Sequence, residues 1–157
     1  MMSKRLLIIS VFVLFLPAIH SAAENRKANI KGPITITSET LTADNKAHTA
    51  LFEKSVVAKT TDLTIQADKM LVFYQEDGGE VTKIEATGSV RVLRELRIIT
   101  SKSAIYYADE EKVVFTGEPR AMDGDNVVSG TMITYFMGDD RFLVENSRVI
   151  LKSKKEH

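Results

Sequence analysis

The chain has 157 residues, and its 21 lysines and arginines balance its 21 aspartates and glutamates. A neutral chain argues against a nucleic-acid partner, because nucleic acid needs a basic face. The sequence has no cysteine, which excludes disulfides and thiolate metal sites.

The first 23 residues are typical of a secretory signal peptide. Lys4 and Arg5 precede an apolar run over residues 6–16, and the small residues Ser21 and Ala23 follow it. The run is shorter than the roughly 20 apolar residues of a membrane-spanning helix. We expect cleavage after Ala23 and export of one domain, residues 24–151. An uncleaved membrane anchor is the alternative.

Two landmarks recur in the same order four times, which predicts a degenerate repeat of roughly 30 residues. The first landmark is an apolar residue followed by small polar residues. It occurs at Ile36, Ile65, Ile99 and Val128, with spacings of 29, 34 and 29 residues. The second landmark aligns on Lys54, Gly88, Gly117 and Asn146, with spacings of 34, 29 and 29 residues.

Each repeat has the pattern of a pair of strands. Over residues 83–92, apolar and polar residues alternate with the period of a half-buried strand. Leu63, Ile65 and Ala67 alternate in the same way, and the phase then breaks before Met70. This break predicts a corner or a bulge.

Turn-forming residues separate the predicted strands, at 76–80, 108–112, 123–126 and 137–140. We find no pattern for a helix of three turns, and we expect residues 152–157 to form a charged, frayed tail. Repeated antiparallel strand pairs with one apolar face must close over that face. The sequence therefore predicts an all-β fold, a folded-over β-jelly roll with unpaired strands at both ends.

Candidate catalytic residues are sparse. His48 and His157 have no partner at ligand or triad spacing, and residues 123–126 ("DGDN") begin like a calcium loop but lack its later ligands. No phosphate-binding loop or nucleophile elbow is present. We therefore expect no enzyme activity, no metal and no cofactor. A carbohydrate-active enzyme that uses surface carboxylates is an alternative, but no pair of carboxylates stands out.

The apolar strand face is the remaining candidate site. Alternation alone does not distinguish a packed core from two splayed layers with a groove for an apolar ligand. A structural β-repeat protein with a closed core is therefore a second alternative. The predicted groove residues are Ile34, Ile36, Leu63, Ile65, Ile84, Val90, Val92, Tyr106, Val113, Phe115 and Ile133.

Several phrases between residues 32 and 151 together resemble the LptA/OstA family of periplasmic lipopolysaccharide-transport proteins. They are "PITITSETLTAD", "LTIQADKMLVFY", "ATGSV", "VVFTGEPRA" and "GTMITY". The resemblance implies an OstA-type β-jelly roll in the periplasm that binds the lipid A part of lipopolysaccharide. It also implies head-to-tail assembly into a bridge between the inner and outer membranes, with LptC-like and LptD-like proteins as partners. An LptC-like anchored relative is a further alternative.

Family ligand contacts map onto three places in this chain. They are Ile34 and Ile36 on the first strand, Val90 and Val92 on the middle strands, and Tyr106. Leu93 replaces Val92 if a bulge changes the phase, and the segment 91–97 is tight where relatives carry a longer loop. For assembly, we expect edge pairing between residues 34–41 of one copy and 142–150 of the next. The interface residues would be Ile34, Ile36, Thr37, Phe142, Val144 and Val149.

Overall fold

A computed structural model describes residues 34–61, 63–76 and 79–152. The predicted signal peptide and the tail beyond Lys152 lie outside these residues. Within them, no helix is long and apolar enough to cross a membrane. The strands are β1 (Thr35–Thr37), β2 (Thr40–Asp44), β3 (Thr49–Lys59), β4 (Thr64–Tyr74), β5 (Val81–Arg94), β6 (Arg97–Tyr107), β7 (Lys112–Thr116), β8 (Arg120–Asp123), β9 (Asn126–Ser129), β10 (Met132–Phe136), β11 (Arg141–Glu145) and β12 (Arg148–Ile150).

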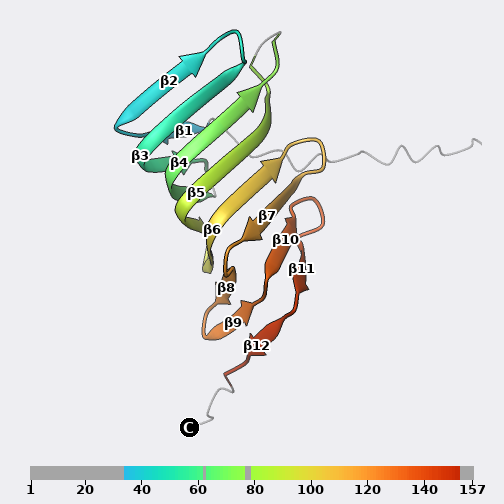
Figure 1. The fold of residues 1–157 in the computed structure, drawn as a ribbon. Helices are drawn as coiled ribbons and strands as arrows, with labels where there is room; N and C mark the ends of the chain where they lie inside the picture. The colour runs from blue at the N-terminus through green and yellow to red at the C-terminus, as the bar shows by residue number, and fades with distance from the viewer. Residues whose placement is uncertain (1–33, 62, 77–78, 153–157) are drawn as a thin grey trace, which may run out of the picture.

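The strands form one antiparallel sheet, laid out nearly in chain order from β1 and β2 to β11 and β12 (Figure 1). The all-β prediction is therefore confirmed. The sheet folds over along a line of corners, which the long strands β3, β4, β5 and β6 cross without ending. The shorter strands end at this line, so that β1, β7, β9 and β11 are followed beyond it by β2, β8, β10 and β12.

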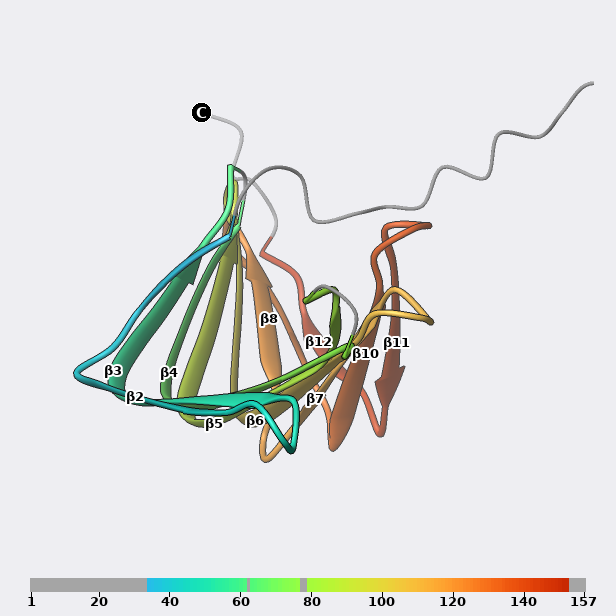
Figure 2. The ribbon, with the colours of Figure 1, turned by 90° about the horizontal axis from the view of Figure 1, so that it is seen from above.

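The fold-over produces two layers. Layer A contains residues 40–53, 69–76, 79–87, 103–116 and 132–145, and layer B contains 35–37, 56–61, 63–66, 90–101, 120–129 and 148–150. Figure 2 shows the N-terminal strands as a V whose arms spread away from the corners, with the C-terminal strands turned relative to them. We call the open side of the V, where the hairpin turns lie, the mouth.

Left-handed backbone at one repeated position builds the corners. The four aligned residues of the second landmark all have positive φ: Lys54 (66°), Gly88 (77°), Gly117 (75°) and Asn146 (49°). The β3–β4 register shifts between Glu53 and Val56, and the β5–β6 register shifts between Thr87 and Val90. Extra residues in left-handed conformation bend a strand sharply. The repeat seen in the sequence is therefore a repeat of corners.

The two landmarks also meet each other in space. The residues three positions after the first landmarks are Glu39, Asp68, Lys102 and Thr131. Each of them lies beside the second-landmark residue that comes next in the sequence. The Glu39 amide donates to the Lys54 carbonyl (3.1 Å), and the Lys102 amide donates to the Gly117 carbonyl (3.1 Å). The Asn146 side-chain amide donates to the Thr131 hydroxyl (3.1 Å). Asp68 occupies the same place beside Gly88.

Gly88 should be the corner residue most sensitive to a methyl group. It has a φ of +77°, and a Cβ there would collide with the Asp68 side chain. We expect Gly88→Ala to cost about 2 kcal/mol of unfolding free energy, from backbone strain plus the collision. Gly124→Ala is the matched control, because Gly124 also has positive φ (+57°) but nothing lies within 4 Å of its Cβ position. Equal losses in urea unfolding of the two variants would contradict this account.

The predicted turns and the predicted phase break are confirmed. Residues 108–111, 124–125 and 137–140 connect adjacent antiparallel strands, and the described part of 75–80 does the same. The β4–β5 register shifts between Gln66 and Lys69, where the sequence loses its alternation. Residues 91–97 form the tight hairpin that the sequence suggested, since Arg94 pairs directly with Arg97.

Both ends of the described sheet are open. At one end, β1 and β2 pair only with the two halves of β3. At the other end, β11 pairs only with β10, and β12 pairs only with β9. The predicted edge segments, 34–41 and 142–150, therefore coincide with these free edges.

Candidate functional site

The inner faces of the two layers form an apolar trough. In layer B, residues that pair directly across successive strands make an unbroken row, here called the layer B ladder. Paired residues in a sheet share one face and contact each other. The layer B ladder consists of Ile36, Ala58, Ile65, Val92, Ile99, Ala121, Val128 and Val149.

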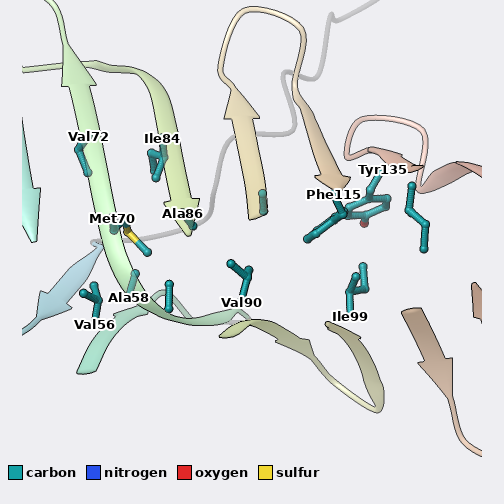
Figure 3. Close-up of a cluster of buried hydrophobic side chains, with 13 residues drawn as sticks. Val56, Ala58, Met70, Val72, Ile84, Ala86, Val90, Ile99, Phe115 and Tyr135 are labelled. Carbon is teal, nitrogen blue, oxygen red and sulfur yellow. The ribbon is translucent and has the colours of Figure 1, made fainter. Parts of the chain in front are cut away.

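Layer A contributes two such rows. The deep ladder lies two residues from the corners and consists of Leu41, Phe52, Met70, Ala86, Ala104, Phe115, Ile133 and Val144. The outer ladder lies nearer the mouth and consists of Ala43, Ala50, Val72, Ile84, Tyr106, Val113, Tyr135 and Phe142. Figure 3 shows Met70, Ile84 and Phe115 facing Val56, Val90 and Ile99 across the trough.

The trough is not filled by its own side chains. One cavity has about 800 Å³ of empty space, including the part open to solvent, and it lies over the middle strands. A second cavity of about 670 Å³, measured in the same way, lies toward the N-terminal edge. Leu63, Ile65 and Ile84 line both cavities, so the two lie next to each other. The layers are therefore splayed along this stretch and not closed on each other.

Nine of the eleven predicted groove residues line these cavities: Ile34, Ile36, Leu63, Ile65, Ile84, Val92, Tyr106, Val113 and Phe115. Val90 and Ile133 line neither cavity, and they are only 1% and 0% exposed. Both lie two residues from a corner, where the layers converge and cover them. Val92, and not Leu93, lines the cavity, which places the inward phase of β5. Ligand contact by these residues stays a prediction.

The sequence reasoning missed several lining residues. They are Met70, Ala86, Arg94, Ala104, Tyr135 and Met137 in the larger cavity, and Ala58, Thr60, Val72 and Val81 in the smaller one. Ala86 shares its parity with Ile84, so alternation was enough to find it. Met70 and Val72 follow the phase break in β4, and they become visible only once the corner is placed.

A polar network crosses the mouth between the layers. Arg94, at the end of β5 in layer B, donates to the Tyr135 hydroxyl of layer A (2.5 Å). That hydroxyl donates to Asp140 (2.9 Å), and Arg97 of layer B donates to the same carboxylate oxygen (3.0 Å). The hydrogen bond from Tyr135, together with Arg97, holds the pKa of Asp140 below its usual value. Burial and the bond to Asp140 raise the pKa of Tyr135.

The described residues offer little other chemistry. Within these ranges, no group of three or more histidine and carboxylate side chains could hold a metal ion. Gly124 and Asp125 of the "DGDN" segment are the two-residue turn between paired Asp123 and Asn126. The His48 ring packs edge-on against Tyr74, with centroids 6.0 Å apart.

Fold and site together define a β-jelly roll with an open apolar trough between its two layers. Residues 35–141 match the family described as LptA/(LptD N-terminal domain) LPS transport protein, and the chain belongs to this family. The predicted resemblance is thereby confirmed.

A solved structure supports the same fold. The chain is similar to LptH, the LptA-homologous periplasmic component of the lipopolysaccharide transport device of Pseudomonas aeruginosa. The TM-score is 0.71 at 11% identity, over 80% of this chain and 99% of that one. No curated protein sequence matches the chain.

Proposed function

We propose that this protein carries lipopolysaccharide through the periplasm by holding the lipid A acyl chains in the trough. The continuous apolar ladders, open to solvent along the cavities, are the observation that carries the proposal. Residues 1–23 would direct the protein to the periplasm and would be removed by cleavage after Ala23. The family is a transport family, and the trough explains the role without any catalytic step.

The physical basis is the cost of exposing acyl chains to water. Each methylene removed from water is worth roughly 0.8 kcal/mol, so a multi-acyl lipid does not leave a membrane readily. A trough that shields the chains lowers this cost. Its open mouth lets the sugar headgroup stay hydrated, so the chains alone need to fit between the layers.

The free edges suit the bridging role. β1 and β2 at one end, and β11 and β12 at the other, have unpaired sides on which a neighbouring strand can add. The ladders reach these edges with exposed apolar residues, Leu41 (57%) at one end and Val149 (52%) at the other. A copy added in register would extend the trough. The two ends differ, so the contact is heterologous and propagates as a filament. LptC-like and LptD-like proteins would cap its ends.

The test places a photo-crosslinking residue at Ile36 or, separately, at Thr35 in growing cells. Ile36 lines the smaller cavity, whereas its neighbour Thr35 is exposed on the other side of β1. We expect lipopolysaccharide adducts at Ile36 and not at Thr35. Equal expression and export of the two variants is the control. An exported, folded protein with adducts at neither position would show that the trough does not carry lipid, and would favour a structural β-repeat protein.

A further inference from the structure

Two arginines face into the mouth of the trough from layer B. Arg94 follows Val90 and Val92 with the same inward parity, and it lines the larger apolar cavity. Arg97 pairs directly with Arg94 across the β5–β6 hairpin and shares the inward parity of Ile99. Like charges directly opposite each other destabilise a sheet, and a guanidinium on an apolar wall costs free energy unless it is paired. An anion between the layers would stabilise both guanidinium groups.

Asp140 supplies that anion from layer A. Its carboxylate accepts from Arg97 and from the Tyr135 hydroxyl, which in turn accepts from Arg94. Asp140 is 63% exposed in its side chain, whereas Arg97 is 32% exposed. The carboxylate thus approaches the arginines from the solvent side, on the turn between β10 and β11. An anion arriving from solvent would compete for the same position.

A polar hollow adjoins the apolar cavity at this point. It has about 580 Å³ of empty space, including open solvent, and it is lined by Arg94, Glu95, Leu96, Arg97, Asp123 and Asp140. Arg94 lines both this hollow and the apolar cavity. An amphiphile with its chains in the cavity would therefore place its headgroup in the hollow. Glu95 and Asp123 border the hollow, which disfavours a polyanion and suits one anionic group on a hydroxyl-rich headgroup.

We propose that Arg94 and Arg97 form an anion subsite that binds the phosphate of a glycolipid headgroup in place of the Asp140 carboxylate. This inference rests on the proposed function, because the acyl chains in the trough hold the headgroup at the mouth. Guanidinium groups suit phosphate, since each presents several donors in a planar fork and stays charged at all relevant pH values. Displacing Asp140 would also break the bond from Arg97 to layer A, whereas Arg94 would keep its bond to Tyr135.

The experiment measures binding of three probes to the purified full-length mature protein. The probes are monophosphorylated lipid A, fully dephosphorylated lipid A with the same acyl chains, and inorganic phosphate. We expect the wild type to bind the phosphorylated lipid about tenfold more tightly than the dephosphorylated one, as charge-assisted hydrogen bonds predict. Inorganic phosphate at millimolar concentration should leave lipid binding unchanged, because it lacks the acyl anchor.

Arg94→Gln and Arg97→Gln should each remove most of this preference. Arg91→Gln is the matched control, since Arg91 lies on the same strand and is exposed on the outer face. Asp140→Asn should act in the opposite direction and tighten binding of the phosphorylated lipid, because the competing carboxylate is gone. Partial unfolding would not give a gain confined to the phosphorylated lipid, because newly exposed apolar surface would bind both lipids. Thermal melting verifies that each variant folds.

The outcomes distinguish a failure of the anion subsite from a failure of acyl-chain binding in the trough. Equal affinity for the two lipids, or a preference that survives in both arginine variants, would overturn the subsite and leave acyl binding standing. Displacement of lipid by inorganic phosphate would assign the arginines to free phosphate and not to a headgroup. If neither lipid binds to the folded wild type, the proposed function itself fails, and this inference fails with it.

Discussion

Replacing Ala104 with leucine should weaken lipid binding at least tenfold while the protein stays folded. Ala104 is 6% exposed and lies in the deep ladder between Ala86 and Phe115, on the wall of the larger cavity. The three added carbons would project into space that an acyl chain would otherwise occupy. Each displaced methylene forfeits roughly 0.8 kcal/mol, so the loss of binding free energy should exceed 1.4 kcal/mol, a factor of ten.

The stability of this variant should differ from that of an ordinary overpacked core. Added methylenes in a filled core cost about 1–3 kcal/mol, but here the empty cavity receives them. We expect the melting temperature to change by less than about 5 °C. Thr87→Leu introduces the same leucine side chain at an exposed residue next to Ala86, and should leave lipid binding intact. A folded Ala104→Leu protein with wild-type lipid affinity would mean that acyl chains do not use this cavity.

A proline in β11 should abolish head-to-tail assembly without unfolding the single copy. β11 is a free edge, and Leu143 and Val144 lie near its middle. In an antiparallel edge strand, successive amides alternate between the neighbouring strand and the outside. Proline removes the amide donor, so one of the two substitutions breaks a bond to β10 and the other removes only the outward donor.

Light scattering across a concentration series, with circular dichroism of the same samples, measures this effect. We expect at least one of Leu143→Pro and Val144→Pro to keep the wild-type circular dichroism spectrum and a cooperative melting transition. By light scattering, the same variant should be a monomer at concentrations where the wild type forms chains. A proline at exposed Glu145, the last residue of β11, is a milder control that should retain more assembly. Chains that persist in every folded proline variant would show that assembly does not use this edge.

The repeating parts of the molecule could be predicted from the sequence, because strand alternation and turn-forming residues are local patterns. Alternation placed Ile65, Ile84 and Val92 on one face, and the turn-forming residues marked the hairpins. The aligned Lys54, Gly88, Gly117 and Asn146 marked the corners, although a lysine does not by itself suggest positive φ. Only the recurrence of the position revealed that these residues share one backbone role.

Sequence patterns could not predict the polar network at the mouth. Arg94 and Tyr135 are 41 residues apart, and Arg97 and Asp140 are 43 apart, so their meeting depends on how the two layers close. Arginine at the end of a strand normally indicates a solvated turn, and Tyr135 fits an apolar face. The sequence also could not show how deeply each inward residue is buried, because Val90 and Val92 share one parity but differ in their distance from the corner.

The unbroken ladders have a consequence for the direction in which a bound lipid would move along the trough. Each crosses eight strands spaced about 4.8 Å apart, and every member of the deep ladder and of the layer B ladder is apolar. If acyl chains occupy the trough as proposed, a chain that moves across the strands would meet similar aliphatic and aromatic surfaces at every step, with no large difference in free energy between one step and the next. Such a path would let the bound lipid diffuse in both directions. The direction of net lipid flow would then be set by loading of lipid at one end of the trough and removal of lipid at the other.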